Sequence, residues 1–488
     1  MSEMKLSRRH LLSTSIFGAA GLTMPASNAF TAETNKAPNI VFILADDLGF
    51  ADVSCYGRPD LKTPNIDQIA AEGVKFSQAY ANSAVCSATR TALITGRYQY
   101  RLRVGLEEPI LNSTNIGLPP NHPTLPSLLK KIGYTTALIG KWHLGGLPDY
   151  SPLKSGYDHF YGFRGGALDY FSHNGANHKG DLWDGDMLVD QHGYLTNLLG
   201  KKAVDLITAF ARQSNPFFMS LHFNAPHWPW EGPDDQAESL RLEGKLNSFD
   251  SGTQRTYQRM IEEMDAQIGN VLQSLTSAGL SRDTIVIFTS DNGGERFADT
   301  WPFTGRKTDL LEGGLRIPTV MRWPGKIKPG GTTDQVAISM DWLPTLLAAA
   351  GTNPDPAYPS DGMNLLPFVK DNAPCVSRKL FWRYKANAQR AARDGDYKVL
   401  KRGNNTFLFD VVADPMERAN LKARHKDIYD RLVQEWNDWD ATMLPEIRES
   451  FTDNFWGAAL ADHLGEQKAS EEPDLGTDWP DSPINAPF

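Results

Sequence analysis

Carboxylates, basic groups and histidines follow directly after short apolar runs at several places in this 488-residue chain. One early run ends in Asp46-Asp47, and a later run ends in Asp291-Asn292. Carboxylate and amide oxygens suit a hard divalent cation such as calcium. Basic and imidazole groups stand at other run ends or in loops that contain glycine: Arg90, Lys141, His143, His227 and Lys307. A cationic pocket around a bound metal suits a tetrahedral oxyanion such as sulfate or phosphate.

Each of these motifs is by itself compatible with a turn or a helix cap. Their coincidence at four run ends favours a functional site. The runs are short and rich in β-formers, as buried strands are: 39–44, 135–139, 217–223 and 284–289. In a parallel α/β sheet, sites form at the carboxyl ends of the strands, so we expect these polar groups to meet there.

Helical patterns lie between the runs. They open at Thr63-Pro64, cover 126–131, and recur every three or four residues from Tyr257 to Leu275. Alternating strands and helices predict an α/β fold with a mostly parallel sheet and helices on both faces.

The pattern changes after about residue 360. Short strands are predicted over 380–384, 389–393, 397–400 and 406–409, with a hairpin at Asp394-Gly395-Asp396 and a helix over 428–439. We expect a catalytic domain over 30–360, a smaller antiparallel α+β subdomain over 361–450, and an extended tail over 451–488.

The N-terminal segment has the order of a signal peptide. Arg8-Arg9 precedes an apolar stretch over 11–23 that is too short to span a bilayer, and small residues follow up to Ala29. The arginine pair predicts a twin-arginine signal over 1–29, and an ordinary Sec signal is the alternative. We therefore expect contact with the export machinery and a periplasmic or secreted protein. No other segment is apolar enough for stable membrane insertion, and the net charge of −9 argues against a nucleic-acid partner.

The chain has three cysteines, Cys55, Cys86 and Cys375. An odd count in an exported protein raises the question of which one is reactive. Cys55 and Cys375 could pair or remain thiols, and the sequence leaves both options open.

The segment from Cys86 to Arg97 resembles the signature of the formylglycine-dependent sulfatases, which is Cys-x-Pro-x-Arg followed by Thr-Gly-Arg. Here Arg90 and Thr95-Gly96-Arg97 match, whereas Ala88 replaces the usual proline. This departure bears on whether an oxygen-dependent formylglycine-generating enzyme or a radical maturase acts on the chain. Other family motifs follow in the family's order: Asp46-Asp47, Lys141-Trp142-His143, Pro226-His227-Trp228-Pro229, Asp291-Asn292-Gly293, Thr304-Gly305-Arg306-Lys307, Glu312 to Pro318, and Asp414-Pro415 with Asn420-Leu421.

The resemblance implies an alkaline-phosphatase-like fold and the activity of a sulfuric ester hydrolase. It implies that Cys86 becomes formylglycine and that residue 86, Asp46, Asp47, Asp291 and Asn292 surround Ca²⁺. Further roles are assigned as follows: Arg90 and Lys141 stabilise the formylglycine hydrate, Lys141 and Lys307 hold sulfate oxygens, His227 protonates the leaving alcohol, and His143 is the base that releases sulfate.

The stretch from Tyr161 to His173 resembles that of N-acetylgalactosamine-4-sulfatases and related bacterial enzymes. Aromatic and polar side chains in this insertion suit a sugar, although they could instead order a long loop: Arg164, Asp169, His173, His178 and Trp183. We expect a sulfated polysaccharide or oligosaccharide substrate, and galactose-4-sulfate units of an algal galactan such as carrageenan are the working hypothesis.

Two alternatives remain. One is a phosphate or phosphonate ester hydrolase of the same superfamily, although the lack of a histidine beside Asp291-Asn292 favours a single calcium. The other is a catalytically silent protein that binds sulfated glycans, with Cys86 unmodified.

Overall fold

The computed structural model describes residues 37–110, 114–175, 178–242, 245–246 and 250–447. The predicted signal peptide over 1–29 and the tail over 451–488 lie outside these residues. No helix of the described part is both long and apolar enough to cross a membrane.

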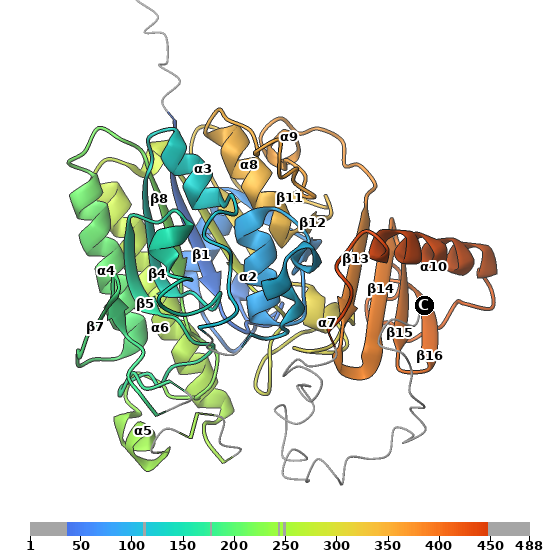
Figure 1. Cartoon of the computed structure of the whole chain (residues 1–488), viewed down its shortest axis with the longest axis horizontal. Coiled ribbons are helices and arrows are strands. Elements are labelled where there is room, and N and C mark those ends of the chain that lie inside the picture. Colours follow the sequence, from blue (N-terminus) through green and yellow to red (C-terminus); the bar gives the residue numbers. More distant parts are fainter. Residues whose placement is uncertain (1–36, 111–113, 176–177, 243–244, 247–249, 448–488) are drawn as a thin grey trace, which may run out of the picture. The chain divides into compact units, whose positions relative to one another are not determined.

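A ten-stranded sheet forms the centre of the fold (Figure 1), in the order β11-β2-β10-β9-β1-β8-β4-β5-β6-β7. From β9 to β5 the neighbouring strands are parallel, whereas β10 is antiparallel to both β9 and β2. The mostly parallel sheet is therefore confirmed. Its strands are β1 (Asn39–Ala45), β2 (Val74–Phe76), β4 (Thr135–Lys141), β5 (His159–Phe163), β6 (Trp183–Asp184), β7 (Met187–Leu188), β8 (Phe217–His222), β9 (Thr284–Ser290), β10 (Thr319–Arg322) and β11 (Gly331–Thr333).

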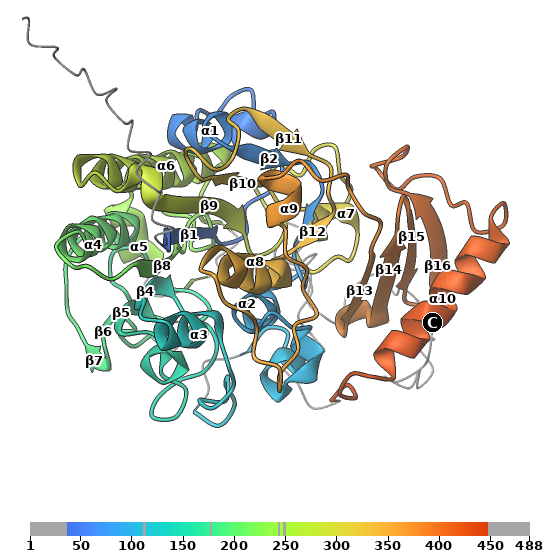
Figure 2. The same cartoon turned by 90° about the horizontal axis from the view of Figure 1, so that it is seen from above.

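Helices cover both faces of this sheet (Figure 2), as predicted. One face carries α1 (Pro64–Ala71), α4 (Leu195–Phe210) and α6 (Gln254–Ser277), and the other carries α2 (Cys86–Thr95), α3 (Leu125–Lys131) and α8 (Trp342–Ala349). All seven residues of β1 are buried, because its alternate side chains enter two separate cores. Shorter elements complete this part: β3 (Ala79–Tyr80), β12 (Ala337–Ile338), α5 (Gln236–Leu242), α7 (Glu312–Leu315) and α9 (Leu366–Val369).

A separate four-stranded antiparallel sheet follows, built from β13 (Lys379–Tyr384), β14 (Gln389–Asp394), β15 (Tyr397–Arg402) and β16 (Asn405–Asp410). Helix α10 (Lys426–Asp440) packs on it through Leu432 and Trp436 (Figure 1). The predicted strands, helix and hairpin of this subdomain are all present. Its core continues into the larger part of the fold through Tyr80 and Ala88, so the two sheets share apolar contacts.

Candidate active site

Four adjacent strands bring the predicted polar groups together. Asp46 and Asp47 follow β1, which lies between β9 and β8, and Asp291 and Asn292 follow β9. Lys141 is the last residue of β4, the next strand beyond β8. Because these strands are parallel, their carboxyl ends meet at one edge of the sheet, as the sequence predicted.

Cys86 is the first residue of α2 and is only 2% exposed. Arg90 is one helical turn further on, so both side chains lie on the same face of the helix. The Cys86 Sγ is 3.3 Å from His143 Nδ1, and Arg90 donates to Asp291 Oδ2 from Nη2 at 2.8 Å. Helix α2 therefore places the predicted nucleophile and its cationic neighbour at the strand ends.

Cations and carboxylates alternate through the centre. Lys141 Nζ donates to Asp46 Oδ2 at 2.5 Å, and Lys307 Nζ donates to Asp47 Oδ2 at 2.7 Å. Together with the Arg90–Asp291 pair, these contacts balance three carboxylates with three cations. An added divalent cation would leave the site with net positive charge, which favours an anionic ester.

The oxygens at the strand ends fit a cation. Within the described residues, Asp46 Oδ1 and Asn292 Oδ1 are buried and accept no hydrogen bond. Two groups could offer ligand atoms to one ion, Asp46 with Asp47 and His227, and Asp46 with Cys86 and Asp291, with the atoms of each group within 4.8 Å of one another. Burial raises the pKa of Asp46 well above its ordinary value although Lys141 opposes this, so a bound cation would stabilise the charged form of this carboxylate.

His143 is held in one tautomer. Its Nε2 lies 2.8 Å from the carbonyl oxygen of Ile110, which can only accept, so Nε2 carries the proton. The Nδ1 lone pair therefore faces the Cys86 Sγ. Burial and the nearby Lys141 lower the pKa of His143 well below its ordinary value, so the imidazole is neutral at pH 7.

His227 has the opposite tautomer. Its Nδ1 lies 2.7 Å from the carbonyl oxygen of Trp228, so the Nε2 lone pair faces Lys307 Nζ at 3.3 Å. Burial and Lys307 lower the pKa of His227 well below its ordinary value. The His227 imidazole is therefore neutral, and its Nε2 can accept a hydrogen bond from Lys307 Nζ.

Three non-glycine residues of the centre have left-handed backbone. Their φ angles are 63° at Asp47, 56° at His143 and 73° at Thr308, which follows Lys307. Such conformations are uncommon for side-chain-bearing residues and cluster at functional sites.

Two residues of the centre were not predicted as site residues. Glu295 Oε2 lies 3.7 Å from Lys307 Nζ, and burial, opposed by Lys307, raises the pKa of Glu295. His222, the last residue of β8, lies with Nδ1 3.4 Å from Arg90 Nη1. The available signals were an acidic residue directly after the Asp291-to-Gly294 motif and a histidine inside an apolar strand.

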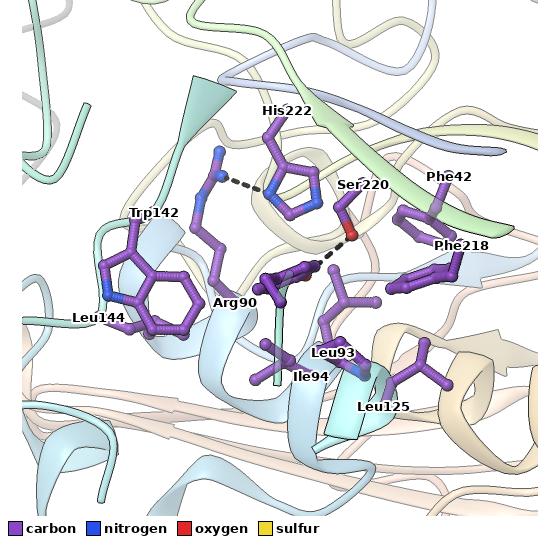
Figure 3. A pocket seen from close by; sticks show the side chains of 12 residues that line it. Phe42, Arg90, Leu93, Ile94, Leu125, Trp142, Leu144, Phe218, Ser220 and His222 are labelled. Carbon is purple, nitrogen blue, oxygen red and sulfur yellow. Dashed lines mark hydrogen bonds between the residues drawn. The ribbon is translucent and has the colours of Figure 1, made fainter. Parts of the chain in front are cut away.

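A small cavity of about 20 Å³ lies beside Arg90 and His222 (Figure 3). Its wall is mostly apolar and includes Phe42, Leu93 and Trp142. Burial and Arg90 lower the pKa of His222 to about 3, so this histidine is neutral. The carboxylates at the strand ends do not line this cavity, which adjoins the polar centre at Arg90 and His222.

The five predicted sugar-contacting residues lie on the segment 164–183, where most of them contact the loop itself. Arg164 is 2% exposed, lies over the Trp183 ring at 4.1 Å and donates to Asp186 at 2.7 Å. Asp169 accepts from the backbone of Ser172 at 2.7 Å, and His173 Nε2 lies 3.1 Å from the Gly193 carbonyl oxygen. His178 is exposed, and sugar contact by any of the five remains a prediction.

The same loop reaches His143 and His227 of the polar centre through its backbone and Tyr170. The Tyr170 hydroxyl donates to the carbonyl oxygen of His227 at 2.9 Å. A Cβ at Gly166 would lie 2.8 Å from His143 Nε2, so only glycine allows this close approach.

All three cysteines are free thiols. Cys55 is half-buried, Cys86 is buried and Cys375 is exposed. The sequence left open whether Cys55 and Cys375 pair or remain thiols. In the structure they remain thiols.

Comparisons with known proteins agree with this geometry. The Sulfatase family model matches residues 38–352, and the model for the C-terminal part of N-sulphoglucosamine sulphohydrolase matches 306–441. The chain is 33% identical over 410 residues to N-acetylgalactosamine-6-sulfatase of Rattus norvegicus, covering 78% of this chain and 75% of the relative. It is 32% identical over 421 residues to Arylsulfatase A of Homo sapiens, covering 79% of each.

A solved structure, Ps i-CgsB in complex with k-i-k-neocarrahexaose, aligns with a TM-score of 0.74 and 28% identity over 86% of this chain and 95% of that one. The family match covers the strand ends that carry the polar centre, and both sheets are included in the two matched segments. The chain therefore belongs to the sulfatase family and is a sulfuric ester hydrolase.

Proposed function

We propose that this protein hydrolyses sulfate esters of a sulfated glycan, with calcium at the strand ends and Cys86 converted to formylglycine. The observation that carries the proposal is the convergence of Cys86, three carboxylates and three cations in one buried centre.

Asp46, Asp47, Asp291 and Asn292, with residue 86, would hold the calcium ion. When bound, calcium supplies charge that stabilises a sulfate oxygen. The hydrated aldehyde of formylglycine supplies one hydroxyl for attack on sulfur and a second hydroxyl that releases the sulfate by elimination.

The other groups of the centre bind charge and move protons. Lys141 and Lys307 would bind sulfate oxygens, and Arg90 and Lys141 would stabilise the hydrate. The Nδ1 lone pair of His143 faces residue 86, so it is suited to take the proton of the second hydroxyl. His227, beside Lys307, is suited to give a proton to the leaving alcohol once it has acquired one.

Two relatives support a glycan substrate. One is named for N-acetylgalactosamine-6-sulfate chemistry, and Ps i-CgsB binds a neocarrahexaose. We therefore favour a sulfated galactan, such as a carrageenan with galactose-4-sulfate units, as the first substrate to test. The predicted signal over 1–29 supports action in the periplasm or outside the cell, after a maturase has modified Cys86 and the export machinery has accepted the chain.

The test is release of inorganic sulfate from a panel of sulfated glycans by protein co-expressed with a maturase. Cys86→Ala is the blank, and peptide mass spectrometry reports formylglycine at position 86. We expect sulfate release from at least one galactan and none from the blank. Hydrolysis of phosphate or phosphonate esters without any sulfate release would support the phosphoesterase alternative. Glycan binding by a protein with an unmodified thiol and no hydrolysis would support the silent binding protein.

A further inference from the structure

We propose that Gln389 of the C-terminal sheet is a positioning residue for Lys307, so that this sheet contributes to the catalytic centre. The inference rests on the role proposed above for Lys307 as a ligand of sulfate oxygens. It concerns β14, a strand that contributes no group to the predicted site.

Thr308, the residue directly after Lys307, is held in an unfavourable backbone conformation. Thr308 has φ of 73°, and its branched side chain makes the left-handed region a genuine outlier. Backbone of this kind persists only where surrounding contacts enforce it. The backbone NH of Lys307 donates to Gly294 O and that of Thr308 to Ala84 O, each at 2.9 Å.

Gln389 makes two further hydrogen bonds to this turn. Its side chain is 1% exposed, and its Nε2 donates to the carbonyl oxygen of Thr308 at 2.8 Å. Its Oε1 accepts from the backbone NH of Leu310, also at 2.8 Å. One side-chain amide thus holds both sides of the turn, which requires a donor and an acceptor on the same group.

The turn links Lys307 to the nucleophile. Ala84, which accepts from Thr308, lies two residues before Cys86. With the Gln389 contacts removed, Thr308 can relax toward ordinary backbone angles, and the Lys307 ammonium moves relative to Asp47 and residue 86. A displacement of about 1 Å near a reacting centre can cost on the order of 100-fold in rate.

Other contacts from the same sheet reach the following residues. Arg402 of β15 lies 3.3 Å from Asp309 Oδ1, and Lys398 Nζ lies 2.9 Å from Glu312 Oε1. The segment after Lys307 is therefore packed against the C-terminal sheet at several points, and Gln389 is the contact nearest to Lys307 in the chain.

The experiment compares Gln389→Met with Gln335→Met in the matured, calcium-loaded enzyme. Gln335 is a matched control because its buried amide clamps Val376 in the same manner, accepting from the Val376 NH at 2.8 Å and donating to the Val376 carbonyl oxygen at 3.2 Å. The probe is inorganic sulfate, whose dissociation constant is measured by titration calorimetry beside kcat and KM for a hydrolysed glycan. Lys307→Ala and the double variant Lys307→Ala/Gln389→Met complete the set.

We expect Gln389→Met to weaken sulfate binding roughly tenfold, as removal of a group that orients a ligand commonly does. Gln335→Met should stay within about twofold of wild type, and Gln389→Met should add nothing in the Lys307→Ala background. If Gln389→Met does not fold, Gln389→Glu serves instead, since it keeps the acceptor for Leu310 and removes the donor to Thr308.

If Gln389→Met binds sulfate as tightly as wild type while Lys307→Ala binds it more weakly, the role of Gln389 is overturned. The proposed role of Lys307 is then unaffected. An equal further loss in the double variant also overturns the role of Gln389, because Gln389 would then act independently of Lys307. Wild-type affinity in Lys307→Ala overturns the proposed role of Lys307 itself.

Discussion

Burial determines the chemistry of the individual cysteines. It raises the pKa of Cys86 to about 11, although Lys141 and Lys307 act in the opposite direction. The thiolate is the reactive form of cysteine, so an unmodified Cys86 is nearly inert at neutral pH. This agrees with a need for conversion to formylglycine before catalysis.

Alkylation of protein made without a maturase tests this directly. At pH 8, iodoacetamide should label the exposed Cys375 first, while Cys86 stays unlabelled until the protein is unfolded. Cys55 should also react slowly, because burial raises its pKa to about 12. Peptide mass spectrometry reads the labelling, and denatured protein is the control in which all three react. Labelling of Cys86 as fast as Cys375 would contradict the prediction.

The carboxylates at the strand ends predict stabilisation by calcium. A ligand at 100 times its dissociation constant stabilises a fold by about 2.7 kcal/mol, so Ca²⁺ should raise the melting temperature measurably. Asp46→Asn should abolish most of this shift, because it removes a buried carboxylate of which one oxygen accepts no hydrogen bond. The matched control is Asp341→Asn, a buried carboxylate 2.5 Å from Arg378 that is outside the centre. An equal calcium shift in wild type and Asp46→Asn would refute the assignment of this ligand.

At the scale of elements, the loop that follows β5 is attached to the segment after β8 by hydrogen bonds. The backbone NH of Tyr170 donates to Glu231 Oε2 at 3.1 Å, and the Tyr194 hydroxyl donates to the Glu231 carbonyl oxygen at 2.8 Å. Since Tyr170 also donates to His227, the loop and the catalytic segment are coupled through the residues around Glu231.

This attachment contains a carboxyl that the fold keeps neutral. Burial, with Asp169 nearby, raises the pKa of Glu231 to about 9, compared with an ordinary value of 4.5. Between these two pH values the folded state keeps the proton that the unfolded state loses. The stability of the wild type therefore falls as pH rises through this window, by up to about 1.4 kcal/mol per pH unit.

Glu231→Gln removes the titrating carboxyl, and with it this loss of stability at rising pH, while its amide oxygen can still accept from the Tyr170 NH. Its melting temperature should exceed that of the wild type by a margin that grows from pH 5 to pH 9. Glu262→Gln, which removes a partly exposed carboxylate of α6, is the control and should not reproduce the trend. Parallel melting curves for wild type and Glu231→Gln across this range would show that Glu231 is ionised in the folded state.

For the whole molecule, a buried ionic cluster joins the C-terminal sheet to α7 of the larger part of the fold. Lys398 of β15 is fully buried and lies 2.9 Å from Glu312 Oε1 and 3.0 Å from Glu417 Oε1. Burial acts to raise the pKa of Glu312, yet Lys398 and Arg316 hold it below its ordinary value. The cluster therefore depends on its central cation.

Lys398→Met should destabilise the protein by about 3–5 kcal/mol, because it removes the buried ammonium that lies between two buried carboxylates. The free energy of unfolding in urea measures this. Lys379→Met breaks an ion pair of the same sheet whose side chains are 46% and 21% exposed, and it should cost less than about 1 kcal/mol. A similar small loss in both variants would mean that the cluster contributes little to holding the C-terminal sheet to α7.

Local sequence was sufficient for the main strands and for the polar groups of the centre. The apolar runs around β1, β4, β8 and β9 are continuous because both faces of the sheet are covered. Such continuous runs can be identified as strands from the sequence alone. Since parallel strands end at one edge, residues placed after the runs had to meet. The antiparallel strands β13 to β16 were equally readable from short runs and the Gly395 turn.

Only the tertiary structure decided which side chains support these groups. The neighbours of His222 and Glu295 in the sequence do not identify their partners Arg90 and Lys307, and the Gln389 contact joins residues 81 positions apart in the chain. Likewise, Arg164, Asp169 and His173 looked available for a sugar, but the fold gives each of them hydrogen-bond partners within the protein. Periodicity reports the face on which a residue lies, whereas the partner of a buried polar group depends on how distant segments pack, which no local pattern records.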